Sequence, residues 1–280
     1  MKKKIKNLSG DIILNIFFIV VCFIALIPIL YAFSVSLNAQ NNLLSSDFSF
    51  IPKEFTLKNY KAVLFDEPVL LWLKNSAILS ISTLVISLGV AIPAAYAFSR
   101  YRFPGKKAIL YVLLLLNAFP TILSMFAMYR LLSPVGLADK KIGLIIVYTG
   151  TMAIFGLWNL KGYFDTIPRG IEEAAKIDGA NDFQLAVKIM LPLSKPSIIV
   201  TAVMILIYVW NEYIYAVTFL TGSENYTLAS GLYSLQATET AGNWPTFAAA
   251  SLLVSMPILI VFLTVQKHMV SGLTTGGMKG

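Results

Sequence analysis

The sequence contains almost no cysteine or histidine and little charge. One cysteine, Cys22, and one histidine, His268, occur in 280 residues, and 13% of the residues are charged. A lone cysteine excludes an internal disulfide, a CxxC redox motif and a cysteine-based zinc site. We interpret Cys22 as a small buried hydrophobic residue within an apolar run. His268 follows Lys267 at a predicted helix end, and we interpret it as interfacial.

The sequence also lacks short motifs of phosphate binding and hydrolysis. There is no GxxxxGK[ST] phosphate loop, so the chain does not bind ATP by that route. HExxH and GxSxG are missing, and no nucleophile is paired with a base in the pattern of a hydrolase. We therefore expect a protein that is not an enzyme and holds neither a cofactor nor a metal ion.

Long apolar runs are abundant. Hydrophobic residues make up 57% of the chain, against about 45–50% in soluble domains. Several runs of about twenty residues are long enough to cross ~30 Å of hydrocarbon as helices, and none alternates with the period of a barrel strand. We predict an all-α membrane protein with six transmembrane helices, at about 12–34, 75–99, 108–131, 142–160, 197–220 and 247–267. The first run follows four lysines like a signal peptide, but its length favours a retained helix.

Basic residues indicate the orientation. With six spans, both termini lie on one side, which carries fifteen of the 22 Lys and Arg residues. The positive-inside rule makes that side cytoplasmic, although Lys140 and Lys141 fall on the other side. The net charge of +8 therefore reflects topology, and we expect no nucleic-acid partner.

Two external loops and four prolines add detail. The loop 35–74 is long and mixed in charge, which predicts a partly folded cap. The loop 221–245 has no Lys or Arg but contains Tyr226, Tyr233 and Trp244, either as membrane-interface aromatics or as a surface for an external partner or sugar. Prolines inside the predicted spans favour kinks, and they are Pro28, Pro93, Pro120 and Pro257.

The loop 162–196 predicts a cytoplasmic helix–turn–helix. Pro168 favours a first helical turn, and the acidic pair that follows suits the positive end of the helix dipole. Gly179 is a natural C′ residue with positive φ, and Asn181 or Asp182 caps a second short helix. A smooth stripe of small residues on the first helix fits a partner's groove, or packs on the chain's own bundle or the membrane surface.

One acidic residue, Glu212, lies within a predicted span. An intramembrane carboxylate is costly unless it is paired or faces water. We expect Glu212, with Asn211 and Tyr213, to line a translocation path or to bind a partner subunit. The alternative is an interfacial acid that reaches outward.

Three stretches carry a family resemblance. The string from Glu172 to Ala180 (EEAAKIDGA), followed by Leu191 and Pro192, resembles the EAA motif of ABC importer permeases. The string YAFSRYRFPGK at 96–106 is similar to the loop after the second span of carbohydrate permeases. The tail GLTTGGMKG at 272–280 resembles that of the maltose/maltodextrin type of permease subunit.

The resemblance implies a type I importer half-channel in the bacterial cytoplasmic membrane. Its implied parts are a cytoplasmic head and first span at 1–34, an external loop at 35–72, a transmembrane domain at 73–267 with the EAA loop 162–196, and a tail at 268–280. Implied partners are a second, different permease subunit, two ATPase subunits that bind ATP–Mg, and an extracytoplasmic sugar-binding protein. The implied ATPase-coupling residues are Glu172, Glu173, Ala174, Ala175, Asp178, Gly179, Ala180, Leu191 and Pro192, and in the tail Thr274, Thr275, Gly276 and Gly277.

The function that the resemblance implies is import of an oligosaccharide, of the malto-oligosaccharide kind, powered by the separate ATPase. The competing hypothesis is a stand-alone secondary transporter of sugar or ions, with Glu212 as its ion or proton site. The first requires ATP and a binding protein, whereas the second works alone under an ion gradient.

Overall fold

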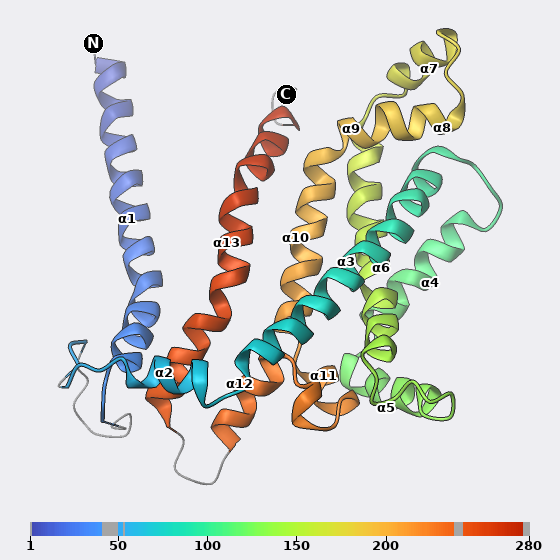
Figure 1. Cartoon of the computed structure of the whole chain (residues 1–280). Helices are drawn as coiled ribbons and strands as arrows, with labels where there is room; N and C mark the ends of the chain where they lie inside the picture. The colour runs from blue at the N-terminus through green and yellow to red at the C-terminus, as the bar shows by residue number, and fades with distance from the viewer. Residues whose placement is uncertain (1, 41–49, 53, 238–242, 277–280) are drawn as a thin grey trace. The chain divides into compact units, whose positions relative to one another are not determined.

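The computed structural model describes residues 2–40, 50–52, 54–237 and 243–276, and almost all of them lie in helices (Figure 1). Within these residues, extended pairing is confined to one bridge between Asn38 and Phe55. The predicted all-α fold class is confirmed. The α-helices are α1 (Lys2–Ser36), α2 (Lys58–Phe65), α3 (Val69–Arg100), α4 (Lys106–Ala118), α5 (Thr121–Leu132), α6 (Lys141–Thr166), α7 (Arg169–Ile177), α8 (Asp182–Gln184), α9 (Leu191–Leu193), α10 (Lys195–Asn211), α11 (Ile214–Phe219), α12 (Leu228–Ala237) and α13 (Trp244–Gly276). A π-helix, η1 (Leu185–Met190), and a 3-10 helix, η2 (Ser223–Asn225), complete the set.

The chain divides into two compact units. The first comprises Met1–Val69 and Leu232–Ser255, and the second comprises Leu70–Gly231 and Met256–Gly280. In the first unit, the Asn59 amide on α2 donates to the carbonyl oxygens of Ser36 and Asn38, both at 2.9 Å. The described part of the predicted external cap is therefore folded against the end of α1.

After its lysine-rich first turns and Asp11, helix α1 is apolar on nearly all sides. The most apolar stretch of Gly10–Ser36 has a mean hydropathy of 3.1 and no buried residue. Cys22 is exposed, so its interpretation as a buried core residue is wrong for this chain. A helix that is hydrophobic all round and yet uncovered is suited to lipid or to another subunit.

Four predicted spans are continuous helices, namely Gly10–Ser36, Val69–Arg100, Lys141–Thr166 and Trp244–Lys267. The third predicted span is broken, because α4 and α5 meet at an angle of 99°. Pro120 has no N–H to donate, and Phe119 before it is extended, with φ −68° and ψ 137°. The other prolines singled out in the sequence, Pro28, Pro93 and Pro257, lie inside continuous helices.

The fifth predicted span is also broken. Helix α10 ends at Asn211, Glu212 is extended, and the short helix α11 follows. At its other end α10 bends by 73° from the segment Asp182–Leu193. By length and composition, the described residues contain four helices able to cross a membrane, or six if each bent pair is counted as one span.

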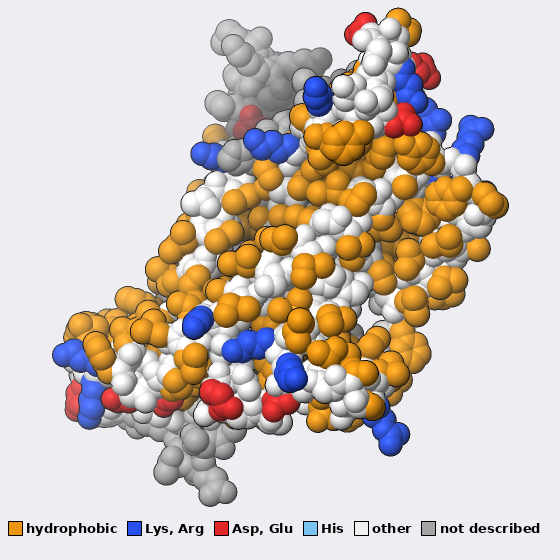
Figure 2. Space-filling model, turned by 45° about the vertical axis from the view of Figure 1, so that its right-hand side comes forward, with side chains coloured by type: hydrophobic (Ala, Val, Ile, Leu, Met, Phe, Trp, Pro, Cys, Tyr) orange, Lys and Arg blue, Asp and Glu red, His pale blue; other side chains and the backbone are white. Residues whose placement is uncertain are grey.

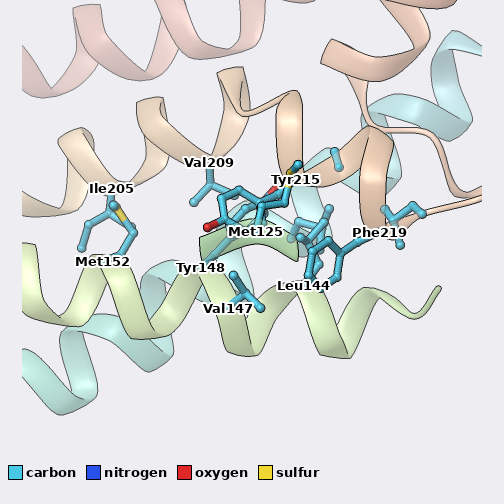
Figure 3. Close-up of a cluster of buried hydrophobic side chains, with 12 residues drawn as sticks. Met125, Leu144, Val147, Tyr148, Met152, Ile205, Val209, Tyr215 and Phe219 are labelled. Carbon is cyan, nitrogen blue, oxygen red and sulfur yellow. The ribbon is translucent and has the colours of Figure 1, made fainter. Parts of the chain in front are cut away.

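The core of the second unit lies between α3, α5, α6, α10 and α11. Figure 3 shows Met152 and Ile205 facing each other from α6 and α10, with Tyr148, Val209 and Tyr215 grouped near the end of α10. The complete buried cluster is Leu79, Met125, Leu144, Val147, Tyr148, Met152, Ile205, Val209, Tyr215, Ala216, Phe219 and Leu220.

Small residues let α3 and α6 approach closely. A Cβ placed on Gly156 of α6 would lie 2.9 Å from the Cβ of Ala91 on α3. Ala91 and Ala95 join Leu160, Phe164 and Met190 in a second buried cluster. Close backbone approach through small residues is the usual way to pack helices in lipid, where apolar burial alone gives little driving force.

The second unit carries different segments at the two ends of its long helices. Helices α7, α8 and α9 lie at one end, and α5 and α11 lie at the other (Figure 1). Around α7 and α8, acidic and basic side chains crowd the surface, whereas the flanks of the neighbouring helices are largely hydrophobic (Figure 2). The flank of α4 shows this well, because Leu114, Leu115 and Leu116 are all exposed.

Candidate functional site

Helix α7 ends in the glycine turn that the sequence predicted. Gly179 has φ +86°, its N–H donates to the carbonyl of Lys176, and the N–H of Ala180 donates to that of Ala175. These two bonds form a Schellman motif, which satisfies the last carbonyls of the helix. Pro168 stands one residue before the helix, in extended conformation, and Glu172 lies in its first turn.

The second helix of the loop is capped by Asn181. Its side chain accepts from the N–H of Gln184 at 2.8 Å, and the Gln184 side chain accepts from the N–H of Asn181 at 3.0 Å. This reciprocal pair is a capping box, and it decides between the two predicted caps. From Asp182 to Leu193 the chain stays helical, with the π-helix η1 at its centre. The predicted helix–turn–helix is confirmed.

The loop exposes apolar side chains at its outer tip. Ile177 is 87% exposed and Phe183 is 75% exposed, on either side of the Gly179 turn. Large apolar groups left open beside charged ones are typical of an interaction surface. Of the predicted coupling residues, Glu173, Ala174, Asp178, Gly179 and Pro192 are exposed, and Glu172, Ala175, Ala180 and Leu191 are partly buried.

An exposed ion pair also crosses the turn. Lys176 Nζ lies 3.1 Å from Asp182 Oδ1, and each side chain is 57% exposed. The hydrogen bond to Asp182, with the attraction of that carboxylate, raises the pKa of Lys176. Solvent screens an exposed pair of this kind, so it adds little to stability.

Arg100, at the end of α3, holds the base of the loop, and the sequence did not single it out. Its Nε pairs with Oε1 of Glu172, with the two side chains 7% and 12% exposed. One Nη donates to the carbonyl of Ile167 at 3.1 Å and lies 3.8 Å from the sulfur of Met190. The available signal was its place within the string at 96–106, but its partners lie 67 to 90 residues away.

A second group of polar contacts lies beside the Arg100–Glu172 pair. Ser99 Oγ donates to Oδ1 of Asp165 at 2.6 Å, and Lys161 donates to Oδ2 of the same carboxylate at 2.6 Å. Arg100 also donates to Ser99 Oγ at 3.0 Å. The ends of α3 and α6 and the start of α7 are thus joined by one polar network.

Glu212 stabilises a helix break. Its Oε1 accepts from the N–H of Tyr215 at 2.9 Å, and its Oε2 accepts from the N–H of Ala216 at 3.2 Å and from the hydroxyl of Tyr148. The carboxylate therefore caps the first turn of α11, where backbone N–H groups need acceptors. Both carboxylate oxygens are therefore bound within the chain itself. Asn211 is exposed, and its amide donates to the carbonyl of Ile207 at 2.8 Å.

A hollow of about 460 Å³ lies between α4, α5, α6 and α10. Its lining is mostly apolar and does not include the predicted path residues Asn211, Glu212 and Tyr213. Sequence reasoning missed it because its polar members are scattered over four helices and α11. Those polar members are Asn117, Thr121, Ser124, Thr151, Tyr208 and Tyr215.

At the opposite end, neutral contacts attach the segment after α11 to the start of α3. The Asn75 amide donates to the carbonyls of Glu224 and Tyr226, both at 2.9 Å, and Ser76 Oγ accepts from the N–H of Leu228 at 2.8 Å. Trp72 is 3% exposed. A Cβ placed on Gly231 would lie 2.2 Å from its ring, so only glycine fits there.

Asp139 fixes the same segment from the other side. Its N–H donates to the carbonyl of Phe219 at 2.9 Å, and its carboxylate accepts from the N–H of Thr221 at 2.6 Å. The second bond lowers the pKa of Asp139. The residue has φ +60°, a strained conformation that these contacts hold.

The predicted tail residues lie at the end of the described chain. Thr274, Thr275 and Gly276 belong to the last turn of α13. Gly277 lies outside the described residues.

Comparison with known proteins places these features in a family. Residues 87–275 match the model of the family described as "Binding-protein-dependent transport system inner membrane component". The galactooligosaccharides transport system permease protein GanQ of Bacillus subtilis is 36% identical over 269 residues, which cover 94% of each chain. The maltodextrin permease protein MdxG of the same organism is 36% identical, covering 99% of this chain and 98% of MdxG. The maltose/maltodextrin permease protein MalG of Yersinia pestis is also 36% identical, covering 96% and 94%.

Solved structures agree with the fold. A chain of a bacterial ABC transporter that imports the acidic polysaccharide alginate matches with a TM-score of 0.74 and 26% identity, covering 95% of this chain and 97% of that one. A chain of the MetNI methionine ABC transporter matches with a TM-score of 0.56 and 17% identity, covering 73% and 94%.

The match spans the break at Pro120, the loop 162–196 and most of α13, and it covers more than half of the chain. The predicted resemblance, the helical importer-permease fold and the multi-pass inner-membrane location are confirmed. The chain belongs to the binding-protein-dependent transport system inner membrane component family, as an ABC importer permease of the sugar-transporting type.

Proposed function

We propose that this chain is one half of the channel of an ABC importer for a malto-oligosaccharide-like sugar. A binding protein delivers the sugar, and a separate ATPase that binds ATP–Mg supplies the energy. The relatives named for maltodextrin and galacto-oligosaccharides support the substrate class. The absence of a phosphate loop in the sequence is consistent with a borrowed energy source.

The exposed tip of the loop 162–196 carries this proposal. Ile177 and Phe183 form an apolar tip around the rigid Gly179 turn, as expected of a helical element that enters a groove on a partner. The proposed ATPase-coupling residues in the loop are Glu172, Glu173, Ala174, Ala175, Asp178, Gly179, Ala180, Leu191 and Pro192. The proposed ATPase-contacting residues in the tail are Thr274, Thr275, Gly276 and Gly277. Glu172 stands apart from the other loop residues because it faces inward.

The remaining surfaces are assigned to the other partners. A second, different permease subunit completes the channel. Asn211, Glu212 and Tyr213, at the break between α10 and α11, line the translocation path or contact that subunit. The segment 221–245, whose first residues (221–226) are held by Asn75 and Asp139, meets the binding protein. The transmembrane domain is 73–267, preceded by the head and first span at 1–34 and the loop 35–72 and followed by the tail at 268–280. Both termini lie in the cytoplasm.

Bulky or strained residues at the turn test the docking. Gly179→Val forces a branched side chain to φ +86°, and Ala175→Trp fills the small-residue face, so each is expected to release the ATPase. The matched control is Gly170→Ala on α7, where a Cβ meets nothing within 4 Å and φ is not positive. The complex is purified through a tag on this chain, and the retained ATPase and sugar uptake are measured.

We expect uptake to fall on the order of tenfold or more in both variants, which corresponds to a coupling loss of about 1–3 kcal/mol, with the control unchanged. If the ATPase stays bound and uptake persists in both variants, the loop is not the coupling element.

The substrate class has its own test. Malto-oligosaccharides, galacto-oligosaccharides and alginate oligomers are each added to the cognate binding protein, and the thermal midpoint is followed. A ligand at 100 times its Kd stabilises by about 2.7 kcal/mol, so the true substrate gives a clear shift. A shift with galacto-oligosaccharides alone would contradict the malto-oligosaccharide assignment.

A further inference from the structure

The two adjacent glutamates of the loop have opposite surroundings. Glu173 is exposed, whereas the Glu172 side chain is 12% exposed and paired with Arg100. Neighbouring residues on a helix point about 100° apart, so the two carboxylates face different directions. Only Glu173 is open to a partner.

Arg100 contacts three parts of the loop at once. It reaches Glu172 in the first turn of α7, the carbonyl of Ile167 just before α7, and the sulfur of Met190 in the second helix. A planar guanidinium has five donors in a fixed fork, so it sets the distance and the angle between the groups that it joins. The loop is therefore held in one register against the end of α3.

One side of this pair is apolar, and Ser99 and Asp165 lie on another side. Met190 is 1% exposed and packs with Ala95, Leu160 and Phe164, and Tyr96 lies edge-on to Phe164 with ring centroids 6.4 Å apart. A buried ion pair adds little net stability, but loss of one partner leaves a charge without compensation. The main effect of the pair is therefore to fix the position of the loop 162–196 against α3, and its net contribution to the stability of the fold is small.

We propose that Arg100 is a positioning residue that links the loop 162–196 to α3, and that Glu172 acts as its partner inside the permease instead of contacting the ATPase. This inference rests on the proposed function, in which the loop docks on the ATPase. A displacement of the docked loop is passed to α3 through the Arg100–Glu172 pair and, beside it, through Ser99 and Asp165. Without the pair, the ATPase still binds, but its movement does not reach the span.

The test separates binding from transmission. Glu172→Gln and Arg100→Gln are compared with Glu173→Gln in the complete complex in proteoliposomes, with the cognate binding protein, its sugar and MgATP. Three quantities are measured: ATPase retained on the purified complex, ATP hydrolysed, and sugar imported per ATP. Arg102→Gln is the matched control, because Arg102 is an exposed arginine two residues from Arg100.

We expect Glu172→Gln and Arg100→Gln to retain the ATPase and to lower the sugar imported per ATP by roughly tenfold, within the range of typical coupling losses. Glu173→Gln lowers ATPase retention, and Arg102→Gln changes neither. Arg100→Lys keeps the charge but not the fork, so it restores part of the ratio lost in Arg100→Gln. That graded recovery distinguishes positioning from general damage to the fold.

Two outcomes overturn the inference. One is a sugar-per-ATP ratio within twofold of the wild type in Glu172→Gln. This variant decides the matter even if Arg100→Gln fails to assemble, because the carboxamide of glutamine has nearly the shape of the carboxylate. The other is loss of the ATPase in Glu172→Gln to the extent seen in Glu173→Gln. If Gly179→Val and Ala175→Trp uncouple while Glu172→Gln does not, only this inference fails. If those two loop variants have no effect, the proposed function itself fails.

Discussion

Helix α3 attaches a loop at each of its ends, and the two attachments use different forces. At its start, Trp72, Asn75 and Ser76 hold the segment 221–231 with an aromatic contact and neutral hydrogen bonds. At its end, Arg100 holds the loop 162–196 with a charged pair. The first attachment buries its apolar groups, since Leu228 is 1% exposed, whereas the second leaves Ile177 and Phe183 outside.

The difference separates a fixed surface from a transmitting one. Neutral, well-packed contacts resist displacement because breaking them exposes apolar area and leaves polar groups unpaired. A charged pair fixes direction while contributing little net stability. We therefore expect mutations at the start of α3 to affect stability and mutations at the loop tip to affect partner binding.

The largest effect is expected at Trp72. Trp72→Ala removes a buried ring that packs against Gly231, and it should lower the free energy of unfolding by about 3–5 kcal/mol. The measurement is denaturant unfolding in bicelles. The control is Leu70→Ala, two residues earlier and 69% exposed. Equal effects of the two substitutions would show that the contact with Gly231 does not hold the segment.

Asn75 should give the next largest effect. Asn75→Ala leaves the carbonyls of Glu224 and Tyr226 without their amide donor, at a cost of roughly 1–3 kcal/mol. The same unfolding measurement applies, with the exposed neighbour Lys74→Ala as control. If Asn75→Ala lowers the free energy of unfolding no more than Lys74→Ala does, neutral hydrogen bonds do not stabilise the attachment at the start of α3.

Phe183 is expected to act on binding and not on folding. Phe183→Ser removes the apolar tip, so affinity for the ATPase should fall about tenfold, or about 1.4 kcal/mol, with stability unchanged within about 0.5 kcal/mol. Binding is measured by titrating the ATPase onto the reconstituted permease pair. Val135→Ser, at an exposed site in the connection between α5 and α6, should leave affinity unchanged. Unchanged affinity in Phe183→Ser would show that Phe183 is not part of the surface that binds the ATPase.

The smallest effect is the pH dependence at Asp139. The N–H of Thr221 lowers the pKa of Asp139 in the folded state below its unfolded value of about 3.9. Its contribution is therefore complete above that value and is lost as the pH falls through the folded pKa. Because the group is exposed, the effect is small. Asp139→Asn should flatten the stability curve slightly below about pH 4. An unchanged curve would show that the bond from Thr221 to Asp139 does not contribute to stability.

Local features of the sequence predicted much of the fold and part of the site. Hydropathy located the spans, and turn chemistry located Gly179 and the cap at Asn181, because these signals depend on adjacent residues. The pairing of Arg100 with Glu172 depends on residues 72 positions apart, and no local pattern announces it. Pro120 was expected to kink a span, but a proline alone does not specify the size of the bend, which is 99°.

Glu212 shows a different limit. As an acid in an apolar run it attracted a hypothesis about the transport path, while its hydrogen bonds show a cap on α11. Glutamate is not a common capping residue, so no local pattern predicted this role. The prediction that Cys22 is buried was wrong for a related reason, because an apolar run does not indicate which faces of a helix are covered.

The most direct test of the account is sugar uptake into proteoliposomes that contain the permease pair and the ATPase. Uptake is measured with and without ATP, with and without the binding protein, and under an imposed proton or sodium gradient. We predict uptake only when ATP and the binding protein are both present, and none from a gradient alone. Gradient-driven uptake by this chain without the ATPase would contradict the account and support a stand-alone transporter.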